Sequence, residues 1–238
     1  MYILISKEEK QMSNFFVFPT VNSWEENVFK LTPAGVITVA VLIVGLIVLA
    51  IVLQPKEKKN SRFSTKQLVF SAIAMALALV TSMIKLFSLP LGGSVTLMSM
   101  LFIVLIGYWY GPKAGIMTGF AYGLLQFVIE PVFYTVPQLI TDYPLAFGAL
   151  GLAGFFRNKK YGLQIGYVVA LLGRLFFAWL SGVVFFASYA DGTGMNVPVY
   201  SLVYNGSYIF AEGIITVIII SVPAVNKDLN HIKALAQN

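Results

Sequence analysis

The chain has 238 residues, of which 58% are hydrophobic and 11% are charged, with a net charge of +6 and a mean hydropathy of +0.82. Soluble domains carry roughly 25% charged residues, so this composition predicts an integral membrane protein. The chain has no cysteine and a single histidine, His231, near its C-terminus. Disulfides and thiolate metal sites are therefore excluded, and no metal or other cofactor is expected.

Seven apolar segments are candidates for membrane-crossing helices. The first, residues 33–53, has no small-residue cleavage pattern after it, so we expect an anchor helix rather than a signal peptide. Six more are expected at Leu68–Phe87, Leu97–Tyr110, Ala114–Ile129, Val136–Phe156, Leu163–Ala187 and Leu202–Val222. The predicted fold is an all-α integral membrane protein: a six-helix bundle in residues 66–225, preceded by one extra N-terminal transmembrane helix.

The basic residues are distributed asymmetrically around these segments. If the linker 54–65 is cytoplasmic, the inside loops are basic, whereas the outside loops after the first span hold no arginine and no lysine. Lys85 lies near an outer helix end. This predicts a multi-pass protein of the cell membrane, with an extracellular N-terminal tail (1–32), a cytoplasmic C-terminal tail (226–238) and no nucleic-acid partner. The basic residues assigned to the cytoplasmic side are Lys56, Lys58, Lys59, Arg62, Lys66, Lys113, Arg157, Lys159, Lys160, Lys227 and Lys233.

One carboxylate, Asp142, lies in the otherwise uncharged segment Thr135–Phe156. Even on a lenient insertion scale, a carboxylate at membrane depth costs roughly 2.5–3.5 kcal/mol, so it is expected to face a partner, a cavity or a ligand. Gln138 lies four residues away on the same helix face, and Pro144 removes a backbone donor just beyond it. Two explanations stay open: an ion pair with Arg174 that joins two helices, or a ligand site.

Convergence of polar and aromatic residues favours the ligand site. A carboxylate, an amide and several aromatic faces suit a flat, cationic, nitrogen-rich ring. The outer loops 88–96 and 188–198 contain glycine and could cover such a site. The residues expected near Asp142 in the outer half of the bundle are Tyr143, Phe186, Tyr189, Tyr200 and Asn205.

Five segments occur in order between about Thr65 and Val225: LPLGGSVTLMSM, YGPKAGIMTGFAYGLLQF, QLITDYPLAFGALGLAG, SGVVFFASYADG and VYSLVYNGSY. Together they resemble the ThiT (YuaJ) family, the thiamine-specific substrate-binding subunits, or S components, of energy-coupling factor (ECF) transporters. The resemblance implies a non-enzymatic six-helix membrane protein that binds thiamine from outside. It also implies a transmembrane coupling subunit and two cytoplasmic ATPases as partners, since this chain has no GxxxxGK[ST] loop.

The resemblance implies roles for individual residues. The family's Glu-Tyr ligand pair falls on Asp142 and Tyr143, and its later ligand contacts fall on Tyr200 and Asn205. Its membrane lysine or arginine is Arg174, a stacking tryptophan falls on Phe186, and a ligand-contacting histidine falls on Ala178. The small-residue stripe that contacts the coupling subunit falls on Ala72 and Ala76. The predicted ligand-binding set is Asp142, Tyr143, Phe186, Tyr200, Asn205, Arg174, Gln138 and Tyr189.

Two alternative functions stay open. Alanine at position 178 leaves room for another cargo of the same transporter class, such as a pyrimidine precursor or another vitamin. A stand-alone secondary transporter could use Asp142, Arg174 and Glu212 as a proton relay, although no inverted repeat is apparent. A membrane-embedded enzyme is disfavoured because the chain lacks an apparent nucleophile–base pair or metal cluster.

Overall fold

The computed structural model describes residues 17–21, 27–34, 37 and 64–237. Most of the predicted first span, 33–53, and nearly all of the linker 54–65 lie outside the described residues, so both stay predictions. Within the predicted N-terminal tail, β1 (Val17–Val21) pairs with β2 (Asn27–Leu31) as antiparallel strands.

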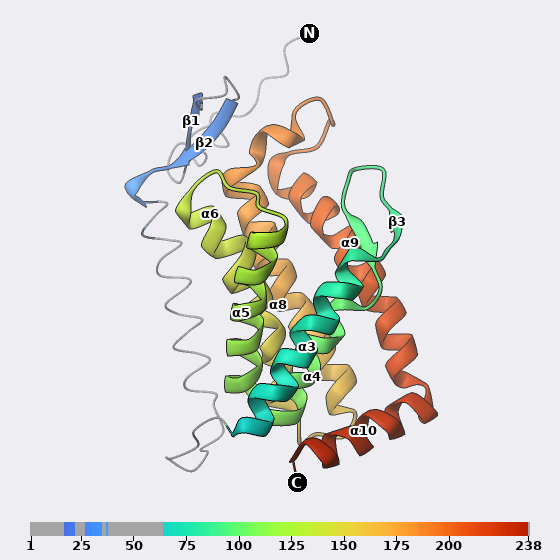
Figure 1. Ribbon diagram of the computed structural model, residues 1–238. Helices are drawn as coiled ribbons and strands as arrows, with labels where there is room; N and C mark the ends of the chain where they lie inside the picture. The colour runs from blue at the N-terminus through green and yellow to red at the C-terminus, as the bar shows by residue number, and fades with distance from the viewer. Residues whose placement is uncertain (1–16, 22–26, 35–36, 38–63, 238) are drawn as a thin grey trace.

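From residue 64 onward the chain is a helical bundle with helices packed side by side (Figure 1). The long segment between α5 and α8 changes helix type three times, and it packs against α4, α5 and α8. The elements in chain order are α3 (Thr65–Met83), β3 (Lys85–Ser88), β4 (Ser94–Thr96), α4 (Ser99–Tyr110), α5 (Pro112–Ile129), α6 (Val136–Ile140), η1 (Thr141–Leu145), α7 (Ala146–Gly148), η2 (Ala149–Phe156), α8 (Gly162–Phe185), η3 (Ala187–Ala190), α9 (Val197–Ser221) and α10 (Pro223–Gln237).

Four helical segments in the described part of the chain are long and apolar enough to cross a membrane: α3, Val136–Phe156, α8 and α9. The helix α4 is also apolar but has only 12 residues, about 18 Å at the α-helical rise. The prediction of an all-helical membrane fold is confirmed in outline, while the number of crossings stays a prediction.

Two boundaries differ clearly from those expected. The helix predicted to reach Phe87 ends at Met83, because the chain turns extended at Ile84 and residues 85–88 pair with β4. The predicted span from Leu202 begins five residues earlier, where the Asn196 side chain accepts a hydrogen bond from the amide of Val199. Such side-chain caps satisfy amides that the first turn leaves unpaired.

Most of the predicted C-terminal tail belongs to the helix α10, which begins at Pro223 and crosses one end of the bundle (Figure 1). Lys233 donates a hydrogen bond to the carbonyl of Arg157 at 2.7 Å, and its ammonium lies 3.9 Å from the centre of the Tyr108 ring. Burial and the neighbouring Arg157 hold the pKa of Lys233 below its usual value. The Tyr110 hydroxyl donates to the carbonyl of Ala236 at 3.0 Å, which fixes the end of α10.

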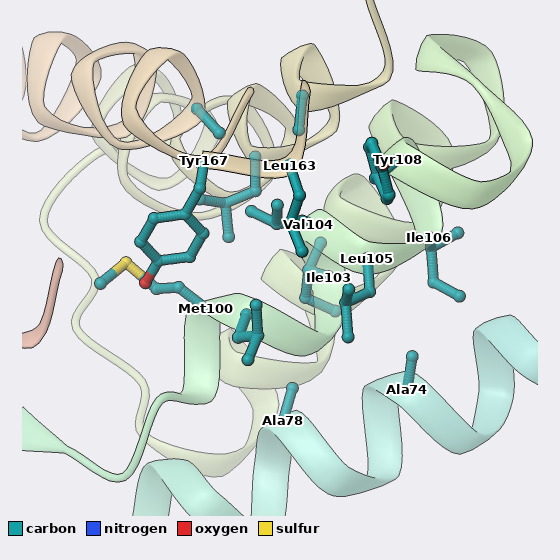
Figure 2. Close-up of a cluster of buried hydrophobic side chains, with 14 of the residues drawn as sticks. Ala74, Ala78, Met100, Ile103, Val104, Leu105, Ile106, Tyr108, Leu163 and Tyr167 are labelled. Carbon is teal, nitrogen blue, oxygen red and sulfur yellow. The ribbon is translucent and has the colours of Figure 1, made fainter. Parts of the chain in front are cut away.

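The apolar core is centred on α4, whose side chains are nearly all buried. Figure 2 shows Ala74 and Ala78 of α3 directed toward α4, and Tyr167 of α8 reaching in among the α4 side chains. Ala78 is fully buried, whereas Ala72 and Ala76 are exposed on α3. The two small-residue pairs therefore lie on different faces, and the pair predicted to contact a partner is the outward one.

Backbones of α5 and the following helical segment touch through glycine. Gly115, Gly119 and Gly123 recur every four residues on α5, and the facing segment carries Gly151 and Gly154 three residues apart, the period of its 3₁₀-helix. A methyl group added to Gly151 would lie 2.1 Å from a backbone nitrogen of α5, and one on Gly119 would lie 2.3 Å from a carbonyl oxygen. Close backbone approach of this kind stabilises helix pairs in lipid, where the hydrophobic effect contributes little.

We predict that Gly151→Ala lowers stability by roughly 3 kcal/mol, because the two backbones must separate to admit the methyl group. The matched control is Gly206→Ala on α9, where an added methyl would lie 3.6 Å from Phe210, an ordinary contact. Thermal unfolding of the full chain in detergent measures the difference. Equal melting temperatures for the two variants would contradict the importance of this contact.

Candidate ligand-binding site

The carboxylate of Asp142 is held by a distorted helical segment. Residues 141–145 form one turn of π-helix, η1, that contains Pro144; a proline lacks the N–H that an α-helix would need there. Single π turns inside α-helices are frequent at functional sites. Gln138 is fully buried and donates a hydrogen bond from Nε2 to Oδ2 of Asp142 at 2.6 Å. The buried hydroxyl of Ser181 lies close to the same carboxylate.

Gln138 also fixes the loop that precedes it. Its Nε2 donates to the carbonyl of Val132 at 3.2 Å, and its Oε1 accepts from the amide of Tyr134 at 3.0 Å. Gln138 does not line the cavity described below, so its place is behind Asp142. Its hydrogen bonds support the carboxylate rather than reach into the open space.

Asp142 and Arg174 do not form an ion pair in the described structure. The Arg174 guanidinium carbon lies 4.3 Å from the centre of the Phe147 ring, a cation–π arrangement. The structure therefore does not support the explanation that Asp142 pairs with Arg174 to join two helices. Both charged groups instead line the same cavity.

The cavity has a volume of about 550 Å³, within the range of small-molecule sites. Along α8 and the residue after its end, the wall follows Arg174, Ala178, Gly182 and Phe186, four residues apart. This stretch is about 18 Å at the α-helical rise. Seven of the eight predicted ligand-binding residues line it: Asp142, Tyr143, Arg174, Phe186, Tyr189, Tyr200 and Asn205. The other lining residues are Leu91, Gly92, Val132, Ala146, Ala178, Gly182, Ser201, Tyr204 and Tyr208.

Aromatic rings form two groups around this cavity. Phe186 packs edge-on against Tyr134 at 5.2 Å between ring centres and contacts Tyr189 at 6.1 Å. On α9, Tyr200 and Tyr204 stack with their ring centres 6.0 Å apart. Both groups line the cavity, so a flat ligand there would have aromatic rings within reach.

Two predicted contacts already have protein partners. The Tyr143 hydroxyl donates to the carbonyl of Glu130 at 2.8 Å and accepts from the amide of Val132 at 2.9 Å. The Asn205 Oδ1 accepts from the Tyr208 hydroxyl at 2.8 Å, and its Nδ2 donates to the Ser201 carbonyl at 3.0 Å. Tyr143 therefore offers mainly its ring to the cavity, and Asn205 offers the remaining acceptor capacity of Oδ1.

The loop between β3 and β4 covers part of the cavity. A methyl group on Gly92 would lie 3.1 Å from the Tyr204 ring, and one on Gly93 would lie 2.7 Å from the Tyr208 ring. Both glycines have positive φ angles, +97° and +77°, which side chains rarely tolerate. The sequence predicted that this glycine-containing loop could cover the site. In the structure the two glycines let the backbone approach two tyrosines of the wall.

The second predicted cover, residues 188–198, contributes Tyr189 from the short helix η3. Its glycines, Gly192 and Gly194, have open space where a side chain would be. The loop therefore has room to move on that side, unlike the β3–β4 loop.

Several lining residues were absent from the predicted set, notably Gly182 and Ser201. A methyl group on Gly182 would lie 2.1 Å from the Ser201 Oγ, and that hydroxyl donates to the carbonyl of Trp179 at 2.8 Å. The four-residue spacing from Arg174 to Phe186 is the sequence signal that could have identified the small residues between them. Among the described residues, no group of three metal-ligating side chains occurs.

Comparison with known proteins relates this geometry to a family. The sequence profile of the family described as Thiamine transporter protein (Thia_YuaJ) matches residues 68–231. The thiamine transporter ThiT of Bacillus subtilis (strain 168) is 36% identical over 166 residues, covering 64% of this chain and 84% of that relative. ThiT of Lacticaseibacillus paracasei is 28% identical over 121 residues, covering 44% of this chain and 60% of the relative. A solved structure of ThiT from Listeria monocytogenes has 22% identity and a TM-score of 0.53, covering 67% of this chain and 93% of that chain; it supports the fold.

We predict that Gly93→Ala loosens the β3–β4 loop, whereas Gly194→Ala does not disturb the cavity. The two glycines have nearly the same φ, +77° and +74°, so alanine costs a similar amount at both, about 1–2 kcal/mol. Only at Gly93 does the added methyl meet a ring. Hydrogen exchange over residues 89–96 should accelerate in Gly93→Ala alone, and equal exchange in both variants would contradict the contact.

Proposed function

This chain belongs to the thiamine transporter protein family, and from that membership we propose that it is the S component of an ATP-driven ECF importer that binds thiamine from the extracellular side. The observation that carries the proposal is the carboxylate of Asp142 on the wall of an aromatic cavity, free of any ion pair with Arg174. A partly buried carboxylate without a cationic partner favours a ligand that brings one. Thiamine contains a permanently cationic thiazolium ring.

The two rings of thiamine suit different parts of the cavity. The thiazolium would rest against Phe186 and the tyrosine faces, where cation–π attraction adds to the pairing with Asp142. The aminopyrimidine would be read by polar atoms, namely the Asp142 carboxylate and Oδ1 of Asn205. Arg174 adds a donor at the far end of the α8 wall.

The two loops that cover the cavity suggest how thiamine is captured and released. Thiamine enters from the predicted outer side, and the loops 88–96 and 188–198 close over it. The loaded subunit delivers its cargo through a transmembrane coupling subunit driven by two ATPases. The outward pair Ala72 and Ala76 on α3 is the proposed contact with that coupling subunit, since small residues let a partner helix approach closely.

We predict that Asp142→Asn weakens thiamine binding by at least about 30-fold, corresponding to roughly 2 kcal/mol for losing one member of a buried charge pair. Titration of the full chain with thiamine, followed by tryptophan fluorescence, measures the affinity; Trp179 adjoins Ala178 of the cavity wall.

The matched control for this substitution is Glu130→Gln, which removes the same charge from an exposed side chain outside the cavity. Its affinity should equal that of the unaltered protein. If Asp142→Asn binds thiamine as tightly as this control, Asp142 does not pair with the ligand.

The alternative cargo is favoured by one observation, the small side chain of Ala178 in the cavity wall. We predict that thiamine nevertheless binds more tightly than hydroxymethylpyrimidine, because only thiamine carries the charge that Asp142 would neutralise. Parallel titrations with the two compounds decide the matter. Tight binding of the pyrimidine alone would overturn thiamine as the cargo.

We predict that Ala72→Trp abolishes co-purification with the coupling subunit and lowers thiamine uptake, while thiamine affinity stays unchanged. The control is Ile214→Trp on α9, where the side chain is 61% exposed and the helix is not a proposed contact.

Thiamine uptake in cells lacking the two ATPases should vanish. Persistent uptake in such cells would instead indicate a stand-alone secondary transporter.

A further inference from the structure

A second buried carboxylate, Glu212, lies outside the cavity and is not used by the proposed transport mechanism. Its side chain is 5% exposed, so it does not face a coupling protein. Oε2 accepts hydrogen bonds from the Thr96 amide at 3.2 Å and from the Thr96 hydroxyl at 2.5 Å. Oε1 accepts from the Ser99 hydroxyl and from the Met100 amide, both at 3.2 Å. Four donors offset the cost of burying the carboxylate.

These donors belong to the junction between β4 and α4. Met98, the residue directly before α4, has a left-handed backbone with φ of 54° and makes no side-chain cap for the helix. Glu212 supplies that cap from another helix, where a negative charge at a helix N-terminus is favourable. Glu212 therefore fixes the base of the β3–β4 loop to α9.

The same face of α9 contacts the β3–β4 loop and the end of β4 at three points. Tyr204, Tyr208 and Glu212 are spaced four residues apart and so lie one above another, about 6 Å apart. Gly92 meets Tyr204, Gly93 meets Tyr208, and Thr96 bonds to Glu212. Three successive points of the loop thus rest on three successive turns of one helix.

We propose that Glu212 is a positioning residue for ligand binding. By anchoring Thr96, its carboxylate holds Gly92 and Gly93 against the two tyrosines and so keeps the cover over the cavity. Loss of the anchor would let the β3–β4 loop lift while the wall of the cavity stays intact. Thiamine as the ligand in this inference rests on the proposed function. The position of the loop rests only on the contacts described above.

Rapid-mixing tryptophan fluorescence with thiamine on the full chain tests this proposal. Glu212→Gln keeps the shape of the side chain but removes the charge, and we expect the dissociation rate to rise about tenfold, as for the loss of a charged hydrogen bond. Thr96→Val removes one hydroxyl donor from the other side of the contact and should act in the same direction. It also serves as the second variant should Glu212→Gln fail to fold.

The matched control is Thr216→Val on the same helix. Thr216 is fully buried, and its hydroxyl donates to the backbone carbonyl of Glu212 at 2.8 Å rather than to the loop. A dissociation rate within about twofold of the unaltered protein is expected, below the effect of any charged hydrogen bond. An equal rise in Thr216→Val and Glu212→Gln would show a general structural effect and overturn the proposal.

Hydrogen exchange without ligand gives an independent readout. Exchange over residues 89–96 should accelerate in Glu212→Gln and Thr96→Val but not in Thr216→Val. Unchanged exchange and dissociation in the first two variants would overturn the proposal. If the unaltered protein binds no thiamine, the proposed function fails, and the exchange comparison alone decides the role of Glu212.

Discussion

Direct contact between the backbones of α5 and the segment 141–156 is the constraint on which the rest of the structure depends. Gly119 and Gly123 on α5, and Gly151 and Gly154 on the facing segment, place no side chain between the two backbones. In lipid, such close packing stabilises helix pairs in place of the hydrophobic effect, which stabilises helix packing in soluble proteins. The contact at Gly123 reaches the carbonyl of Tyr143, and it therefore holds the π turn that carries Asp142.

The buried Glu212 and the half-buried Asp142 show how the surroundings distinguish a structural charge from one available to a ligand. The Glu212 carboxylate accepts hydrogen bonds from four donors of one strand–helix junction. Its charge is therefore already compensated by the protein. Asp142 has Gln138 as donor and borders an aromatic cavity. Because a buried charge is costly until it is compensated, the less satisfied carboxylate is the one that benefits from a cationic ligand.

The helix α9 joins these parts into one unit. One face supplies the stacked tyrosines of the wall and the anchor for the β3–β4 loop, and Asn205 on a neighbouring face hydrogen-bonds to Tyr208 and to the carbonyls of Ala178 and Ser201. The β3–β4 loop, the tyrosines of the cavity wall and the Asn205 amide are thus all fixed to α9. A ligand that orders the cover would act through contacts that already exist in the protein.

Hydropathy and local spacing were sufficient to predict the membrane class, most helix positions, the cost of Asp142 and its pairing with Gln138, since these depend on residues within one helical turn or one span. Seven of the eight predicted site residues meet at one cavity, which the sequence motifs could anticipate because each lies in a recognisable segment. Other features needed the tertiary structure: that Arg174 stacks on Phe147 rather than pairing with Asp142, that Gly93 approaches Tyr208, and that Glu212 bonds to Thr96, 116 residues away. Contacts of this kind depend on how the helices rotate and how deeply they sit against one another. Backbone packing at the glycines sets that arrangement. Their regular spacing is visible in the sequence, but the spacing alone does not identify the segment that they face.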